Sequence, residues 1–183
     1  MIRAVFVRSG ESILEAQQRL RGWIDTALTD NGRQDARKLA LAFRDLRFDH
    51  AYASSLQRAQ EVAAIILQEL KQEVAIDAQV ALKPRDWGLL NGWNINDVIT
   101  HFGQNAYDSW RSGAAPPGGE SLPDVLERVA PFVQTLLTVP RDRTLLIACH
   151  DSVLAAVRAW EHRSRPTHTL NELRRAPFLI FEF

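Results

Sequence analysis

Two arginines and a histidine stand where apolar segments of the sequence end. Arg8 follows the apolar run at residues 2–7, Arg58 comes shortly after the segment at 48–54, and His150 follows the letters TLLIAC. Guanidinium groups bind phosphate and carboxylate oxygens in a bidentate manner, and an imidazole adds a hydrogen bond or a proton. These residue types are compatible with a phosphate or carboxylate site, although single arginines and histidines at strand ends more often have structural roles.

A serine and an aspartate accompany these groups. Ser9 follows Arg8, and Asp151 follows His150. Serine, histidine and aspartate are the residue types of a nucleophile, its base and an orienting group, but the usual imidazole–aspartate hydrogen bond would need an unusual geometry between sequence neighbours. A serine hydroxyl is also a weak nucleophile without a base. We therefore expect Ser9 to cap the turn after the first strand, with a nucleophilic role as the alternative.

Strand-like and helix-like segments alternate along the chain. Short apolar segments predict strands at residues 2–7, 48–54, 74–82, 144–149 and 178–183. Apolar positions at helical spacing predict helices at 27–43, 55–70, 96–102, 122–137 and 152–162, with Thr29 and Ser121 as N-caps. The alternation predicts a three-layer α/β fold, in which a mostly parallel central sheet has helices on both faces. Such a sheet would bring Arg8, Arg58 and His150 together at one edge.

Residues 84–120 interrupt this alternation with a loop-rich excursion. Three tryptophans stand there among glycine, asparagine and proline: Trp87, Trp93 and Trp110. Long insertions in compact domains are often functional. We expect the tryptophans to pack as core and lid, with the lining of a pocket as the alternative.

The composition is that of an ordered chain with balanced charge. The 183 residues, 46% of them hydrophobic, suit a single domain spanning 1–183. Lys plus Arg and Asp plus Glu number 22 each, which predicts neither nucleic acid nor an anionic membrane as a partner. No signal peptide or membrane-spanning stretch is visible, so we expect a cytoplasmic protein. Cys149 is expected to be a buried strand thiol, and Arg174 with Arg175 a solvated surface.

Six ordered motifs give the sequence a resemblance to a known family. They are RSGES at 8–12, GWIDTALTDNG at 22–32, SSLQRA at 54–59, GLLNG at 88–92, GES at 119–121, and a histidine after a buried strand at 150. On these motifs the chain resembles the histidine phosphatase superfamily, in its phosphoglycerate-mutase-like branch, nearly from end to end. The resemblance implies a phosphoglycerate-mutase-like α/β fold.

The resemblance also implies a chemistry. In that family a first histidine attacks phosphorus and becomes a phosphohistidine, two arginines and a second histidine hold the phosphoryl oxygens, and a glutamate protonates the leaving group. Arg8, Arg58 and His150 match the phosphate-binding positions. No cofactor and no metal are implied, and by analogy a homodimer is expected.

Two positions of the expected machinery carry other residues. Ser9 stands where the resemblance places the nucleophilic histidine, and Pro84 stands where it places the acidic glutamate. A serine cannot form a phosphohistidine, and the side chain of a proline has no proton to donate.

Two carboxylates are further departures from the pattern. Glu15 takes the place of an asparagine that usually helps to bind phosphate, and Asp151 takes the place of a glycine. We expect these acids to form ion pairs with Arg8 and Arg58, which would weaken phosphate binding. The alternative for Asp151 is a proton donor, because an aspartate follows the histidine in the acid phosphatase and phytase branch.

The departures favour one of two functions. The first is a degenerate, non-catalytic member of the family, whose residual anion pocket binds phosphate, a small phosphorylated ligand or a protein partner. The alternative is a phosphatase or related hydrolase that uses Ser9, His150 and Asp151 in altered roles. Phosphoglycerate mutase activity itself is not expected, because it needs the phosphorylated histidine and because residues 84–120 are short for a full substrate lid.

Overall fold

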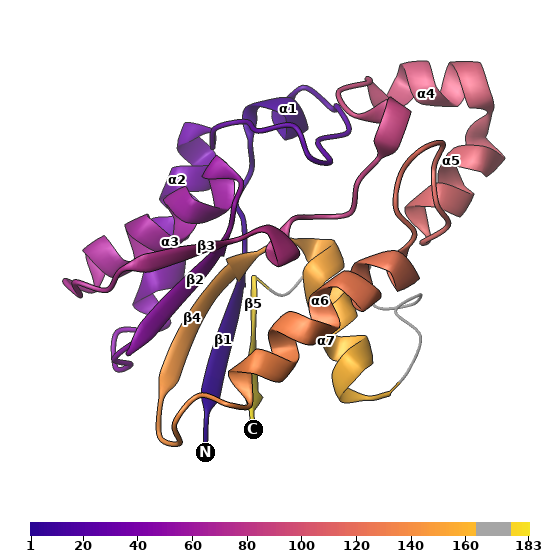
Figure 1. Ribbon diagram of the computed structural model, residues 1–183. Coiled ribbons are helices and arrows are strands. Elements are labelled where there is room, and N and C mark those ends of the chain that lie inside the picture. Colours follow the sequence, from indigo (N-terminus) through magenta and orange to yellow (C-terminus); the bar gives the residue numbers. More distant parts are fainter. Residues whose placement is uncertain (164–176) are drawn as a thin grey trace.

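Five strands form one sheet in the computed structural model, which describes residues 1–163 and 177–183. The strands are β1 (Arg3–Arg8), β2 (His50–Ser54), β3 (Ile76–Gln79), β4 (Thr144–Cys149) and β5 (Phe178–Glu182). Their order is β3-β2-β4-β1-β5, and all neighbours are parallel except β1 and β5 (Figure 1). The predicted mostly parallel α/β sheet is therefore confirmed. The pair Arg174 and Arg175 lies outside the described residues.

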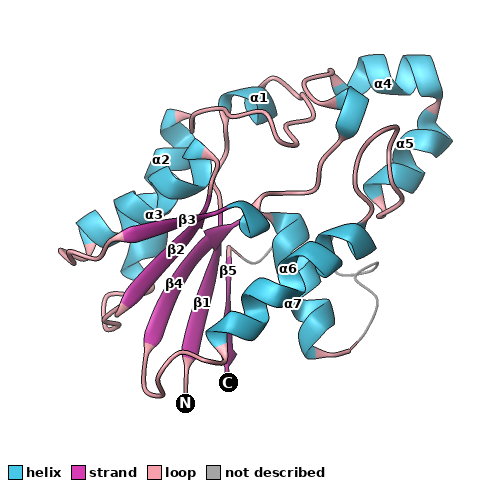
Figure 2. Ribbon diagram, viewed as in Figure 1, coloured by secondary structure: helices cyan, strands magenta, loops and turns pink. Residues whose placement is uncertain are grey.

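Helices cover both faces of this sheet, with α2 and α3 on one side and α6 and α7 on the other (Figure 2). The helices are α1 (Ile13–Ala16), α2 (Asp30–Leu41), α3 (Gln57–Glu69), α4 (Ile95–Phe102), α5 (Gln104–Arg111), α6 (Leu122–Leu136) and α7 (Asp151–Glu161). Short 3-10 turns occur at Val80–Leu82 and Gly88–Leu90. Within the two described ranges, no helix has both the length and the apolar character needed to cross a bilayer.

The alternation of side chains along β1 explains the two helical layers. Ala4 and Phe6 belong to the core cluster that includes α6 and α7. Val5 and Val7 belong to the opposite cluster, which includes α2 and α3. Successive side chains of a strand point to opposite faces, so a strand buried on both sides has a continuous apolar sequence.

The predicted helix caps are present. Thr29 Oγ1 accepts a hydrogen bond from the Gly32 N–H at 3.1 Å. Ser121 and Asp124 form a reciprocal capping box at the start of α6. These side chains satisfy N–H groups that the first helical turn leaves without partners, so both helices begin where the sequence predicts.

Three elements differ from the prediction, and the first of them is the short helix α1 (Ile13–Ala16), which was not predicted. The strand expected at 74–82 ends at Gln79, and residues 80–82 continue as a 3-10 turn. Helix α5 was not predicted. It is separated from α4 by Gly103, whose φ of +86° interrupts the helix. Glycine adopts this conformation at little cost, so the excursion folds as two short helices instead of one.

The excursion forms a small core together with Leu20 from the segment after α1. Trp87 and Trp110 pack against a buried group made of Leu20, Leu90, Val98 and Tyr107. Trp93 is 38% exposed, and its ring contacts those of His101 and Phe102. The tryptophans therefore pack as expected, and Trp87 also lines the cavity described below.

The carboxyl ends of three adjacent strands meet at one edge of the sheet. β4 lies between β1 and β2. The N–H of Ser9 donates to the Cys149 carbonyl at 2.8 Å, which joins the ends of β1 and β4. His150 is the N-cap residue of α7, and Arg58 lies in the first turn of α3, which follows β2. This edge therefore collects polar residues that are far apart in the sequence.

Candidate functional site

A cavity of about 210 Å³ lies at this edge. Its walls come from residues 15–22, the start of α3, the segment after β3, the α4–α5 excursion and the starts of α6 and α7. Five arginines line it: Arg19, Arg21, Arg58, Arg85 and Arg111. Among residues 1–163 and 177–183, only two carboxylates line it, those of Glu15 and Asp151. The arginines outnumber the acids, so the cavity suits an anionic ligand.

Ser9 and His150 are in direct contact. Ser9 Oγ lies 2.9 Å from His150 Nδ1, and each residue is only 4% exposed. His150 lines the cavity, whereas Ser9 is not among its lining residues. We expected the Ser9 hydroxyl to cap the turn after β1. It contacts His150 instead, and this hydrogen bond fixes the orientation of the imidazole ring.

The other ring nitrogen of His150 has a different environment. Nε2 is buried and has no hydrogen-bond partner among the described residues. Burial above all, and then the positive charges of arginines led by Arg58, hold the pKa of His150 well below the ordinary value of 6.5. The imidazole is therefore neutral at physiological pH. A buried nitrogen without a partner is costly, so a ligand that supplied one would be favoured at this position.

Arg58 is a buried cation of the cavity wall, with 1% of its surface exposed. Its Nη1 donates to the Ile24 carbonyl at 2.8 Å, and its Nη2 donates to the Gly22 carbonyl at 2.9 Å. Burial, followed by repulsion from Arg21, lowers its pKa to about 10. Arg58 is therefore charged at neutral pH and is held by backbone oxygens instead of a carboxylate.

The predicted ion pairs are only partly correct. Asp151 contacts Arg8 at 3.5 Å, as expected. Glu15 pairs with Arg21 at 2.8 Å, and neither Arg8 nor Arg58 is its partner. The prediction for Glu15 was wrong because the guanidinium group of Arg21, in the segment after α1, lies next to the Glu15 carboxylate. Arg8 does not line the cavity and approaches it only through Asp151.

Arg85 is a cavity residue that the sequence reasoning missed. It is 5% exposed, and its guanidinium group lies 4.5 Å from the centre of the Trp87 ring. Burial lowers its pKa to about 10, so it carries a charge at neutral pH. The adjacent Pro84 also lines the cavity, and its carbonyl accepts a hydrogen bond from Trp23 Nε1 at 2.8 Å. Pro84 therefore contributes backbone and shape, not a proton.

Cys149 is fully buried in the core. Burial raises the pKa of its thiol, so the thiolate is not formed at neutral pH. It packs as the strand thiol that the sequence predicts.

The fold and the cavity together define an α/β protein with an arginine-rich cavity at the ends of parallel strands. The chain belongs to the histidine phosphatase superfamily (branch 1), whose sequence pattern matches residues 4–176.

Individual relatives support this assignment. The chain is 40% identical over 160 residues to a 2,3-bisphosphoglycerate-dependent phosphoglycerate mutase from Azorhizobium caulinodans, an alignment that covers 84% of this chain and 78% of that protein. Among solved structures, YhfR of Bacillus stearothermophilus superimposes with a TM-score of 0.86 at 26% identity, covering all of this chain and 91% of that one. A mycobacterial glucosyl-3-phosphoglycerate phosphatase in complex with inorganic phosphate superimposes with a TM-score of 0.77 at 25% identity. The superposition covers 93% of this chain and 83% of that one.

These similarities correct the expectation of a degenerate, non-catalytic protein. The relatives are named as phosphoglycerate mutases, and a structural neighbour is named as a phosphatase. The expectation rested on four departures from the family pattern, at Ser9, Pro84, Glu15 and Asp151. It included a residual anion pocket, and at that place the structure has a cavity lined by five arginines and a neutral histidine.

Proposed function

We propose that the protein is a phosphatase that hydrolyses a phosphate monoester in the arginine-lined cavity, with Ser9, His150 and Asp151 in altered roles. One observation carries the proposal: Ser9 orients a neutral His150, whose Nε2 has no partner among the described residues, beside five arginines. In this proposal Ser9 stands at the position of the family's nucleophilic histidine, and His150 acts as the nucleophile instead.

In this proposal His150 Nε2 is the nucleophile. A neutral imidazole with its proton on Nδ1 donates to Ser9 Oγ and leaves the lone pair of Nε2 free. Nε2 attacks phosphorus, the bond from phosphorus to the leaving oxygen breaks, and a phosphohistidine forms. A low pKa favours this role, because a protonated imidazole has no lone pair to offer.

In this proposal the Asp151 carboxyl group enters the reaction protonated, while still accepting from Arg8, and gives that proton to the leaving oxygen. It lines the cavity, follows His150 at the start of α7, and contacts Arg8 at 3.5 Å. In the second half of the reaction a water attacks the phosphohistidine and gives its proton to the Asp151 carboxylate. Phosphate and the free imidazole result, and the proton count of the site is restored.

The arginines hold the phosphoryl oxygens in the proposal. Arg58 and Arg85 are buried cations of the wall, and guanidinium groups match phosphate oxygens in a bidentate geometry. They act where negative charge is carried in the transition state. The phosphate complex of the glucosyl-3-phosphoglycerate phosphatase supports phosphate as the ligand class.

A trapping experiment tests this assignment. Pure protein is incubated with a labelled phosphate monoester, quenched, and treated separately with acid and alkali. We expect turnover and a label that acid removes and alkali does not, which is absent from His150→Gln. A label that survives acid and is lost in Ser9→Ala would place the nucleophile at Ser9 Oγ instead. Absence of both turnover and label across varied phosphoesters would contradict the proposed function.

A second candidate is transfer of a phosphoryl group within phosphoglycerate. The relative that is 40% identical over 160 residues carries the name of this activity, which favours it over an unrelated hydrolase. Conversion of 3-phosphoglycerate to 2-phosphoglycerate that depends on added 2,3-bisphosphoglycerate, and that exceeds release of phosphate, would favour this second candidate.

A further inference from the structure

The cavity arginine Arg85 lies in a segment without regular secondary structure. Residues 83–87 belong to neither a helix nor a strand. No hydrogen-bond ladder of a sheet or helix therefore fixes the backbone that carries this buried guanidinium group. Its position must come from other groups.

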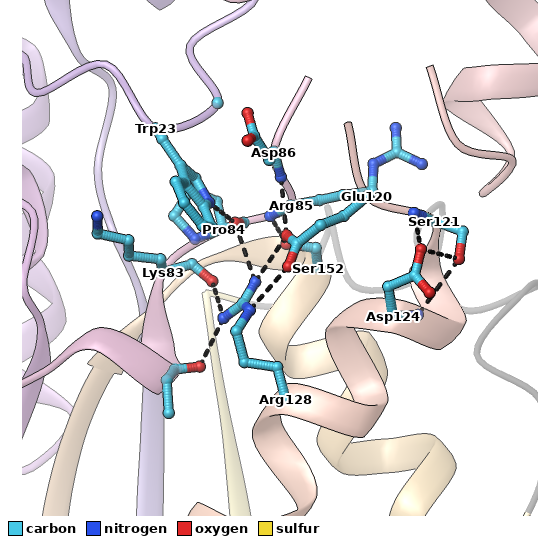
Figure 3. Close-up of polar contacts among 12 residues, drawn as sticks. Trp23, Lys83, Pro84, Arg85, Asp86, Glu120, Ser121, Asp124, Arg128 and Ser152 are labelled. Atoms are coloured by element: carbon cyan, nitrogen blue, oxygen red, sulfur yellow. Dashed lines mark hydrogen bonds and ion pairs between the residues drawn. The ribbon is translucent and has the colours of Figure 1, made fainter. Parts of the chain in front are cut away.

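Side chains from other elements bind this segment on several sides (Figure 3). Arg128 of α6 donates to the carbonyls of Ala81, Lys83 and Pro84 at 2.7, 3.1 and 3.3 Å. Ser152 Oγ of α7 accepts from the Arg85 N–H at 2.8 Å.

Glu120 binds the next residue of the segment. Its Oε2 accepts from the Asp86 N–H at 3.0 Å, and its own N–H donates to the Asp86 carbonyl at 3.0 Å. The backbone on both sides of Arg85 is thus tied to α6, to α7 and to the residue before the α6 cap.

Glu120 and Arg128 are also bound to each other. Arg128 Nε lies 2.9 Å from Glu120 Oε1, and Nη2 lies 2.9 Å from Oε2, so the pair is bidentate. Each side chain is 19% exposed. Together with the three carbonyls, these contacts engage all five N–H donors of the guanidinium group.

We infer that Glu120 and Arg128 are positioning residues that hold Arg85 in the anion cavity. Neither of them lines the cavity, and Arg128 has no donor left for a ligand. They act through the backbone of residues 81–86. Lysine cannot replace Arg128, because a single ammonium group with three protons cannot span a carboxylate and three carbonyls. The inference rests on the proposed function only in taking the ligand of the cavity to be an anion.

Two measurements test the inference in the 183-residue chain, with Arg128→Lys as the variant. Arg33→Lys is the matched control, because Arg33 also pairs with a carboxylate, that of Glu61, but lies away from the cavity. Thermal unfolding first establishes that each variant is folded.

The first measurement is amide hydrogen exchange over residues 81–87, which needs no ligand and no activity. We expect faster exchange in Arg128→Lys and wild-type protection in Arg33→Lys. Unchanged protection in folded Arg128→Lys would overturn the inference whether or not the protein proves to be a phosphatase.

The second measurement is the affinity for inorganic phosphate at fixed ionic strength. We expect Arg128→Lys to bind phosphate about ten-fold more weakly, and the loss to vanish when Arg85→Met is already present, because Arg128 acts through Arg85. Equal losses in both backgrounds would overturn the inference. If wild-type protein does not bind phosphate, the proposed function fails, and the exchange measurement still decides the positioning role.

Discussion

Ser9 Oγ lies 2.9 Å from His150 Nδ1, although the two residues are 141 positions apart in the sequence. The contact joins the turn after β1 to the start of α7. It leaves Nε2 as the ring nitrogen of His150 that has no hydrogen-bond partner among the described residues.

Replacing Ser9 by alanine removes this hydrogen bond. We expect a loss of stability of about 1 kcal/mol and a reduced rate, with the phosphohistidine label still formed, because Ser9 orients the nucleophile and does not supply it. Chemical denaturation and the trapping assay measure the two effects. Ser12→Ala is the matched control, since the Ser12 hydroxyl is buried without a hydrogen-bond partner among the described residues. Complete loss of label in Ser9→Ala would contradict the orienting role.

Acid should destabilise the protein through His150. Its pKa in the folded state is well below 6.5, whereas in the unfolded chain it is near that ordinary value. Below about pH 6.5 the unfolded state therefore binds a proton that the folded state does not, and stability falls by up to about 1.4 kcal/mol per pH unit from this group. Above that pH the contribution is constant.

An ordinary histidine titrates between about pH 5 and pH 8. Chemical denaturation of wild type and of His150→Gln across this pH range isolates the contribution of His150. The difference in stability between the two proteins should change with pH below about 6.5 and be flat above it. A difference that is flat throughout would show that the imidazole is not held neutral by the fold.

Arg58→Lys should weaken phosphate binding. The guanidinium group already donates to the carbonyls of Ile24 and Gly22, and a lysine cannot hold both carbonyls and also meet a phosphate oxygen. We expect an affinity at least about ten-fold lower, or about 1.4 kcal/mol, by calorimetry. Arg37→Lys, at an arginine that pairs with Glu69 outside the cavity, should bind phosphate like wild type.

Glu15→Gln should strengthen phosphate binding. The change removes a negative charge from the cavity and releases Arg21, which now pairs with the Glu15 carboxylate at 2.8 Å. Because the Glu15 side chain is 45% exposed, solvent screens the pair, and we expect a gain of only about three-fold. Glu182→Gln, in the surface pair with Arg3, is the control and should leave the affinity unchanged. A weaker affinity in Glu15→Gln would mean that the carboxylate helps to bind the ligand.

The sequence by itself determined the sheet and most of the helices. The run at 2–7 is apolar at successive positions because β1 is buried on both faces, and that pattern is visible without the fold. Thr29 and Ser121 mark helix starts because a cap acts within three residues of itself. The order of these elements was sufficient to predict that Arg58 and His150 meet at one edge of the sheet.

Only the tertiary structure decided which partners those side chains take. Glu15 pairs with Arg21 instead of Arg58, and Arg85 enters the cavity from a segment that has no periodic pattern. Glu120 and Arg128 bind the backbone around Arg85, although they lie 35 (120 − 85) and 43 (128 − 85) residues after it in the sequence. Local patterns report which face of an element is apolar. The partner of a charged side chain depends on distances of a few ångströms between segments that are remote in sequence, and these exist only once the chain has folded.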